Sequence, residues 1–354
     1  MNSRERFLIA LSGGTPDRIP IFEHLFSPIL QKELLGYNTV LYEGKEQVQL
    51  ATRLGIDAIW TPINGFCGIE ETPHQLDEEY KDEWGVTYRK NGWPIMAQID
   101  VPVKSREDWE RYAMPPVKTH YRTRILRDTK DANTENLAVI LGLLGPFTMA
   151  SWYITDFMNL SIFMYTEPEM VHEMNEAYLA WALEVVDLAV KEGGVDVVQI
   201  SDDWGGTNGL LISPDDFRTF FIPYFRRLVE GIKAHGLPVI MHNDGRIWDV
   251  LDELVDTGIA GLHPVERAAG MDLVRVKEYF KGKITPIGNV NNKVTMCSPD
   301  VSDVEREVLE CIYNAGPGGG YIISSDHSIH DGVPVENVYR LVDLVKKHGT
   351  YPIV

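Results

Sequence analysis

The chain has 354 residues, a hydrophobic fraction of 44% and a formal net charge of −19. This length exceeds one average domain but fits a (β/α)8 barrel with insertions, and the hydrophobic fraction is enough for a large core. The negative charge argues against nucleic acid or an anionic membrane as a partner, and it is compatible with a soluble enzyme or with a basic protein partner.

Cysteine usage indicates a reducing compartment, and the lack of long apolar runs argues against a membrane protein. The three cysteines, Cys67, Cys297 and Cys311, show no close pairing, so a disulfide framework is not expected. Cys297 and Cys311 do not follow expected strands, so nucleophilic cysteine chemistry is not expected either. The N-terminus lacks an apolar core of signal-peptide length, and no run of about 18 apolar residues occurs. We therefore expect a cytoplasmic protein with no membrane partner.

The first part of the chain predicts a helical extension, then strands and helices with one insertion. Ser3 is expected to cap the first helix, which Gly13 and Gly14 end. Between about 82 and 103 apolar and polar residues alternate on either side of Asn91-Gly92, which predicts a β-hairpin inserted into the α/β series. The other elements expected here are a strand at 18–22, a helix at 45–54, a strand at 58–60 and helical segments within 105–135.

From residue 137 onward short apolar runs alternate with amphipathic stretches. Such strands predict a parallel sheet that helices cover on both faces. About eight strand–helix units can be counted, so we expect a closed (β/α)8 TIM barrel that forms a single domain over 1–354. The expected strands are at 137–144, 195–200, 239–241, 284–287 and 321–323, and the expected helices are at 168–193, 214–235, 303–315 and 335–348.

The stretch 238–266 carries the strongest local signal. A short apolar strand leads into the polar turn His242-Asn243-Asp244-Gly245. A helix with apolar residues on one stripe follows, and Gly258 ends it. A second short strand then ends in His263-Pro264-Val265-Glu266. Two polar clusters therefore follow consecutive strands, at the edge of a parallel sheet where α/β proteins place their chemistry.

Similar polar residues follow the other expected strands and contain no lysine. A phosphate or carboxylate site would require Arg or Lys, whereas acceptors without cations suit a bound metal cation or substrate hydroxyl groups. Imidazole and carboxylate are a reasonable ligand set for zinc. The strand-end residues are Glu23, His24, Asn64, Asp202, Asp203, His242, Asp244, His263, Glu266, Asn289, Asp326, His327 and His330.

Several of these residues allow two interpretations. His242 and Asp244 are spaced so that both can reach one ion, or Asp244 caps the following helix. Asp202 and Asp203 are adjacent on an extended segment and face opposite ways, so we expect only one of them at the mouth. His327 is either functional or part of a polar loop held by turns.

Longer motifs in this sequence resemble the uroporphyrinogen decarboxylase superfamily. They are the opening RERFLIALSGGTPDRIPI, the stretch MHNDGRIWDVLDELVDTGIAGLHPVE, the later IGNVNN and the ending GGGYIISSDHSIHDGVPVENV. The resemblance covers nearly the whole chain and implies a (β/α)8 barrel. It does not favour decarboxylation, because members with that activity carry an arginine-rich turn after the first strand to grip substrate carboxylates. Residues 23–27 here read EHLFS, without arginine.

The other branch of the superfamily comprises methyltransferases that exchange methyl groups with corrinoid proteins. Its coenzyme-M-type members hold zinc with a His-x-Cys pair after one strand and a Cys after the last strand. Matching that pattern places His242 on the histidine, Asp244 on the first cysteine and His327 on the second. Because both thiolates are replaced, the resemblance argues against a thiol substrate.

The HxDG turn and the SIH ending are similar to the methyltransferase components of anaerobic O-demethylases. This resemblance implies transfer of a methyl group from a methoxylated aromatic, such as a guaiacol-like phenol, to the Co(I) corrinoid (cobalamin type) of a partner protein. The expected zinc ligands, or holders of a proton source for the ether oxygen, are His242, Asp244, His327 and Glu266. The expected catalytic residues are Asp202, Asp203, His242, Asp244 and Glu266. The expected substrate-binding residues are Glu23, His24, Phe26, Phe66, Phe147, Trp152, Trp204, Asn289 and His330.

Two other classes of function remain open from the sequence. One is a hydrolase or lyase that uses the same acids and imidazoles. The other is a non-catalytic module that binds a corrinoid protein. Whether the chain is a methyltransferase or a binding module, the corrinoid would belong to the partner protein. No tight cobalamin site is therefore expected in this chain. A homodimer is one arrangement that the sequence leaves open.

Overall fold

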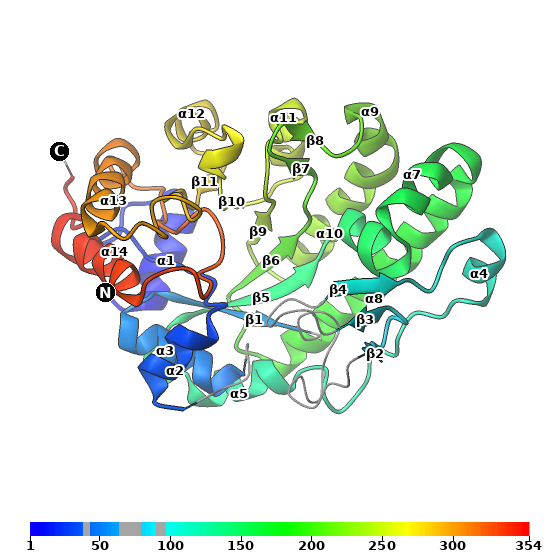
Figure 1. Cartoon of the computed structure of the whole chain (residues 1–354), viewed down its shortest axis with the longest axis horizontal. Helices are drawn as coiled ribbons and strands as arrows, with labels where there is room; N and C mark the ends of the chain where they lie inside the picture. The colour runs from blue at the N-terminus through cyan, green and yellow to red at the C-terminus, as the bar shows by residue number, and fades with distance from the viewer. Residues whose placement is uncertain (38–42, 64–78, 90–96, 354) are drawn as a thin grey trace.

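The computed structural model describes residues 1–37, 43–63, 79–89 and 97–353, which form a (β/α)8 barrel as the sequence predicts (Figure 1). The helices are α1 (Ser3–Leu11), α2 (Pro28–Leu35), α3 (Gly44–Leu54), α4 (Arg106–Arg111), α5 (Arg124–Ala132), α6 (Pro146–Thr148), α7 (Phe157–Thr166), α8 (Pro168–Glu192), α9 (Pro214–Asp216), α10 (Ile222–Ala234), α11 (Leu251–Val255), α12 (Leu273–Tyr279), α13 (Val301–Ala315) and α14 (Val335–His348). The strands are β1 (Ala58–Pro62), β2 (Glu79–Lys81), β3 (Thr87–Arg89), β4 (Ala97–Asp100), β5 (Ala138–Leu144), β6 (Val197–Ser201), β7 (Gly205–Gly206), β8 (Gly209–Leu210), β9 (Val239–His242), β10 (Gly261–His263) and β11 (Thr285–Pro286).

Six parallel strands in the order β1-β5-β6-β9-β10-β11 make most of the barrel wall. Two extended segments, 20–25 and 321–325, complete it through single bridges rather than full strands. Ile322 pairs with Ile287 beside β11, and Ile323 pairs with Ile21. The N–H of Asp57 donates to Ile21 O at 2.9 Å and joins the first segment to β1. The sequence predicted full strands at both places, whereas the described residues form isolated bridges there.

The barrel interior is filled by alternate residues of the strands. Ile240 of β9 belongs to a small apolar cluster with its counterparts on the other strands, whereas Val239 and Met241 pack outward against the helices. Phe7 and Leu11 of α1 belong to the inner cluster as well. Helix α1 therefore closes the end of the barrel where the strands begin, because its apolar face packs under the strand interior.

A buried ion cluster fixes this closed end. The Asp57 carboxylate is fully buried and accepts hydrogen bonds from Arg6 Nη1 at 2.7 Å and from Arg18 Nη1 at 2.8 Å. It also accepts from the N–H of Ile21 at 2.8 Å. A single carboxylate thus ties α1, the first extended segment and β1 together.

The insertion after β1 differs from the expected hairpin. It is a three-stranded antiparallel sheet, β2-β3-β4, that begins at Glu79 rather than near 82. The expected turn at Asn91-Gly92 lies outside the described residues. A tighter β7-β8 pair is a second small insertion, which the sequence did not predict.

Three local predictions need correction. Asn2, not Ser3, caps α1: its side chain accepts from Glu5 N, and the Glu5 side chain accepts from Asn2 N. The expected helix at 214–235 contains a π-helical turn at Phe217–Phe221 between α9 and α10. The helix after β9 is reduced to a 3₁₀ turn and the short α11.

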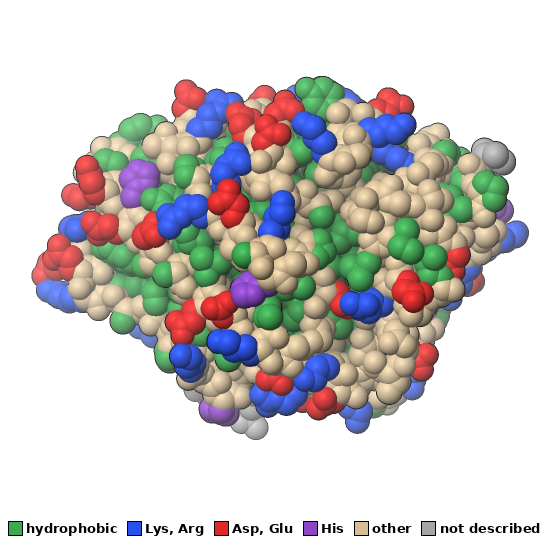
Figure 2. Space-filling model, turned by 180° about the vertical axis from the view of Figure 1, so that it is seen from behind, with side chains coloured by type: hydrophobic (Ala, Val, Ile, Leu, Met, Phe, Trp, Pro, Cys, Tyr) green, Lys and Arg blue, Asp and Glu red, His purple; other side chains and the backbone are tan. Residues whose placement is uncertain are grey.

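Charged side chains of both signs are interspersed on the face seen in Figure 2, so the negative charge of the chain is not gathered there into one patch. Among the described helices, none is both long and apolar enough to cross a membrane.

Candidate functional site at the barrel mouth

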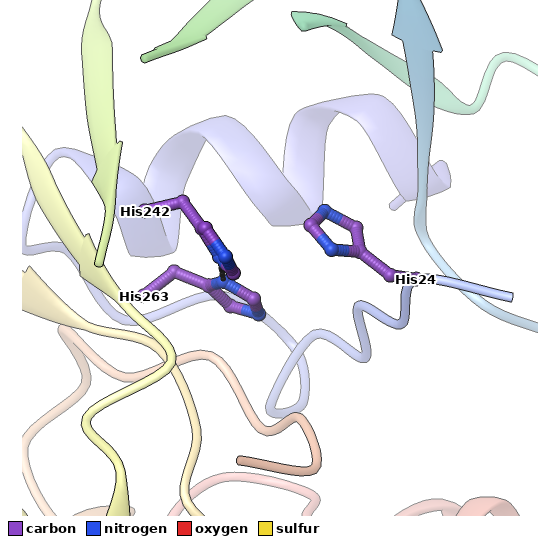
Figure 3. Close-up of side chains that lie close together, drawn as sticks. All are labelled: His24, His242 and His263. Atoms are coloured by element: carbon purple, nitrogen blue, oxygen red, sulfur yellow. Dashed lines mark hydrogen bonds between the residues drawn. The ribbon is translucent and has the colours of Figure 1, made fainter. Parts of the chain in front are cut away.

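Strand register brings the polar strand ends together at the mouth. Residue Ser201 of β6 pairs with His242 of β9, which in turn pairs with His263 of β10. Since alternate residues of each strand face the interior, His242 and His263 lie directly above the inner apolar layer. His24, at the end of the first extended segment, reaches the same level from the opposite wall (Figure 3).

Three imidazole rings meet there. The ring centroid of His24 lies 5.4 Å from that of His242 and 5.0 Å from that of His263. His24 and His263 are 5% and 1% exposed. Burial lowers the pKa of both imidazoles well below the usual range, and the neighbouring histidines add to this effect. These two rings are therefore neutral at physiological pH.

A chain of hydrogen bonds connects His242 to the last strand segment. His242 Nδ1 lies 2.7 Å from His263 Nδ1. His263 Nε2 lies 3.3 Å from Ser324 Oγ, and the Ser324 hydroxyl donates to Ser325 O at 2.8 Å. The other nitrogen of His242, Nε2, points toward the acidic side of the mouth, 3.8 Å from Asp244 Oδ2.

Asp244 is the centre of that acidic side. Its Oδ2 lies 3.3 Å from His327 Nε2, and its N–H donates to Asp203 Oδ1 at 3.0 Å. Burial would raise the pKa of Asp244, but His242 and His327 outweigh burial and hold this pKa below its usual value. The hydrogen bond to Asp244 raises the pKa of His327, whereas burial and the Asp244 charge raise the pKa of Asp203. The bond to His327 settles the earlier alternative, because Asp244 faces this cluster and does not cap a helix.

The polar turn that presents Asp244 requires glycine at 245. Gly245 has φ +89°, and a Cβ there would lie 2.4 Å from the carbonyl carbon of Gly205. Its N–H donates to Glu266 Oε2 at 2.7 Å, and Lys293 Nζ donates to Glu266 Oε1 at 3.1 Å. Glu266 therefore holds the turn in place, and both of its oxygens already have partners.

Two overlapping groups have the spacing of metal ligands. In each of the sets His24, His242, His263 and Asp203, His242, Asp244, one ligand atom per residue lies within 4.8 Å of the others. In the first set the bond between His242 Nδ1 and His263 Nδ1 uses atoms that a metal would need. In the second set Asp244 Oδ1 is buried and has no hydrogen-bond partner among the described residues, and His242 Nε2 lies 3.8 Å from the other oxygen, Oδ2. The second set, with His327 beside it, has the ligand types that zinc accepts, close enough together that they could hold one ion.

Comparisons with known proteins agree with the fold. Residues 85–348 match the family described as uroporphyrinogen decarboxylase (URO-D). The chain belongs to this family. The uroporphyrinogen decarboxylase of Paraburkholderia phytofirmans is 26% identical over 269 residues, which are 70% of this chain and 69% of that protein. That of Thermosynechococcus vestitus is 27% identical over 257 residues, which are 70% of this chain and 71% of that protein.

Among solved structures, a methyltransferase from Methanosarcina mazei superposes with a TM-score of 0.74 at 19% identity, over 98% of this chain and 99% of that one. At this identity the likeness establishes the barrel fold. Membership of the URO-D family indicates an enzyme.

Several residues expected at the site of this URO-D family barrel lie elsewhere. Asp202 points away from the mouth, and its carboxylate accepts from Thr148 N at 2.7 Å and from Trp204 Nε1 at 2.8 Å. Trp204 and Phe147 are buried against α10 and the π-helical turn before it, where each contacts Phe217. In this structure these three side chains hold loops together, so their contacts do not support the expected roles, which stay predictions.

Glu23, Asn289 and His330 also have structural contacts. Glu23 is buried and accepts from both the N–H and the hydroxyl of Ser325. Asn289 lies on the outer side, where its amide oxygen accepts from Arg267 Nη2 at 3.3 Å. His330 Nδ1 accepts from Gly332 N at 3.0 Å within its own loop. Their positions after strands did not reveal that their side chains turn away from the mouth.

The aromatic residues divide into three groups. Phe26 stacks on His24 with ring centroids 5.5 Å apart, so it borders the histidine cluster. Trp152 is 57% exposed. Phe66 lies outside the described residues.

Three residues near the histidines were not singled out from the sequence. Trp60 of β1 has its ring 5.2 Å from that of His24. Gln199 is fully buried within β6, and its carboxamide raises the pKa of His24 against the larger effect of burial. Lys293 provides a cation beside Glu266, so the mouth does contain a lysine. The signal for Gln199 was available, since a polar residue two positions before Ser201 must face the same interior side.

Proposed function

We propose that the chain transfers a methyl group from a methoxylated aromatic to the Co(I) corrinoid of a partner protein. The observation that carries this proposal is the cluster of His242, Asp244, His327 and Asp203 at the mouth, beside the aromatic rings of Phe26 and Trp60. An aryl methyl ether reacts slowly because phenoxide is a poor leaving group. A site that neutralises developing charge on the aryl oxygen lowers this barrier.

The residues of the cluster can supply that neutralisation in one of two forms. A zinc ion held by His242 Nε2, Asp244 and His327 would supply Lewis acidity to the ether oxygen. Without metal, His327 is the proton donor, because its hydrogen bond to Asp244 raises the pKa of the imidazole. As the methyl carbon passes to cobalt, its bond to oxygen breaks, the bonding pair stays on oxygen, and the proton of His327 neutralises it.

The other residues position the substrate. Phe26 and Trp60, whose ring centroids are 6.0 Å apart, give this side of the cluster an aromatic character suited to an aromatic substrate. Asp203, whose pKa burial raises, can hydrogen-bond a neighbouring phenol hydroxyl. Asp202 has no part in this step, since its oxygens hold the loops around Thr148 and Trp204.

Decarboxylation is the second candidate, because the curated relatives at 26–27% identity are uroporphyrinogen decarboxylases. Against it, residues 23–27 contain no arginine to bind a carboxylated tetrapyrrole. The described mouth carries three carboxylates, Asp203, Asp244 and Glu266, and one lysine, Lys293. This excess of negative charge repels anionic substrates. A hydrolase or lyase would instead turn over its substrate without any corrinoid protein.

The test combines elemental analysis with a methyl-transfer assay on purified protein. Methoxyphenols are supplied with a reduced corrinoid protein, and loss of the Co(I) absorbance is followed. We expect turnover by the wild type and a loss of about 100-fold or more in His242→Ala, together with any bound zinc. His330→Ala is the matched control and should retain activity, because within the described part of the chain this histidine bonds its own loop and Cys297 rather than the cluster. Full activity of His242→Ala, or turnover without the corrinoid protein, would overturn the proposal.

A further inference from the structure

The hydrogen bond between two imidazoles at the mouth has a definite direction. His242 Nδ1 and His263 Nδ1 lie 2.7 Å apart, so one of them carries a proton and the other does not. The direction decides which nitrogen of His242 is left with a free lone pair. Figure 3 shows the two rings in contact and His24 apart from this bond.

Counting protons along the contacts gives the direction. The Ser324 hydroxyl has one proton, which goes to the carbonyl oxygen of Ser325 at 2.8 Å, because a carbonyl can only accept. Ser324 Oγ therefore accepts from His263 Nε2 at 3.3 Å. The reverse assignment would place two lone pairs against each other at that distance.

His263 then has its proton on Nε2 and a lone pair on Nδ1. It is 1% exposed, and its contacts among the described residues are with Ser324, His242 and the rings of Phe22 and His24, none of which is an anion. A buried imidazole in such surroundings is neutral and has a single N–H. His242 Nδ1 must therefore be the donor to His263. In the neutral form of His242, the form that can bind a cation, this leaves the lone pair on Nε2, which is directed toward Asp244.

We propose that His263 and Ser324 form a positioning pair that holds His242 in the tautomer whose Nε2 can bind a divalent cation such as zinc. The inference rests on the metal-binding form of the proposed function, which it deepens. Histidine ligands usually donate their second nitrogen to a carboxylate, a carbonyl or water, and this fixes both the tautomer and the ring orientation. Here a neutral imidazole accepts that hydrogen bond. A neutral imidazole polarises the N–H of His242 less than a carboxylate would, so a metal bound to His242 would retain more positive charge.

The test measures zinc affinity of the purified apo protein by competition with a chelator, without any methyl donor. His263→Phe keeps a ring of similar size but removes the acceptor, and we expect zinc to bind about 10- to 100-fold more weakly. His263→Asn offers an amide oxygen near the position of Nδ1 and should recover most of the loss. Ser324→Ala removes the hydroxyl that fixes the proton on His263, so its effect should be smaller than that of His263→Phe.

His24→Phe separates this arrangement from a three-histidine metal site. His24 makes no hydrogen bond to His242 among the contacts described, so zinc affinity should be unchanged in this variant. An equal loss in His24→Phe and His263→Phe would assign His263 as a ligand and overturn the proposal. Unchanged affinity in His263→Phe, or a wild type that binds no zinc, would overturn it as well.

A second readout needs no metal. Long-range proton–nitrogen spectra of protein with ¹⁵N-labelled histidine distinguish the two neutral tautomers. We expect His242 to carry its proton on Nδ1 in the apo wild type and to lose this preference in His263→Phe. Zinc binding and the expected tautomer, without methyl transfer, would support the positioning pair while refuting the proposed function. Methyl transfer by a protein that binds no zinc would support the proposed function and refute the positioning pair.

Discussion

Replacing Asp202 should destabilise the fold more than replacing its neighbour Asp203. The carboxylate of Asp202 is fully buried and accepts from Thr148 N at 2.7 Å and from Trp204 Nε1 at 2.8 Å. The loop at Gly145 packs so closely on it that a Cβ there would lie 2.1 Å from Asp202 Cγ. The variant Asp202→Ala would therefore leave these two donors without an acceptor, together with the more distant N–H of Phe147 at 3.5 Å.

The expected magnitude follows from these contacts. Each buried donor left unsatisfied costs about 1 to 3 kcal/mol, so Asp202→Ala should lower the free energy of unfolding by about 2 to 6 kcal/mol. Asp203 accepts one hydrogen bond, from Asp244 N, and lies at the partly exposed mouth. Asp203→Ala should therefore cost about 1 kcal/mol.

Urea unfolding followed by tryptophan fluorescence measures both variants against the wild type. Asp202→Asn is an informative third variant, because its amide oxygen can still accept from one of the two donors, and it should fall between wild type and Asp202→Ala. The reasoning fails if Asp202→Ala unfolds within about 1 kcal/mol of the wild type, or if the two alanine variants lose equal stability.

Two further predictions concern buried carboxylates. Burial raises the pKa of Glu23 from 4.5 to about 8. The contribution of Glu23 to stability is therefore fully present below pH 4.5 and is lost as the pH rises through about 8. The urea midpoints of Glu23→Gln should approach or pass those of the wild type over this pH range, and parallel pH profiles of the two proteins would contradict this. Asp57→Ala would remove the buried acceptor shared by Arg6, Arg18 and the N–H of Ile21, although Asp17 would still pair with Arg6. Thermal unfolding should report a loss of about 3 to 5 kcal/mol, and a loss under about 1 kcal/mol would show that other contacts hold the closed end.

Most of the barrel was predictable because its strands are short apolar runs and its helices carry clear stripes. The helices at α3, α8, α13 and α14 agree with the expected ranges to within two residues. The first and last barrel positions were predicted as full strands. They are held by bridges instead, because side chains such as Asp57 bond the backbone there. No sequence pattern predicts such a contact between residues that are distant in the chain.

The candidate site was predictable in position but not in side-chain direction. His242, Asp244 and His327 meet as the spacing and the resemblance implied. The pair Asp202-Asp203 was expected to split between two faces, and it does, but which residue faces the mouth depends on strand register with β9. The direction of Asn289 depends on Arg267, which lies on a different loop.

His263 shows the limit most clearly. From the sequence it was one of the polar residues at strand ends, and its importance comes from a contact with a residue 21 positions earlier and another 61 positions later. Neither contact can be derived from sequence spacing, because both depend on how neighbouring strands align. Closed barrel geometry supplies that alignment.

Helix α1 has a consequence for the sequence of events during a reaction cycle. Phe7, Ala10 and Leu11 fill the barrel below the histidines and are at most 3% exposed, so the described chain offers a small molecule no passage from that end. Among the described residues, the mouth is then the opening that remains. Under the proposed function, a partner seated on the mouth would trap whatever lies inside, and this would impose an order: the donor molecule would enter first, the partner would dock, and the demethylated product would leave only after the partner had gone.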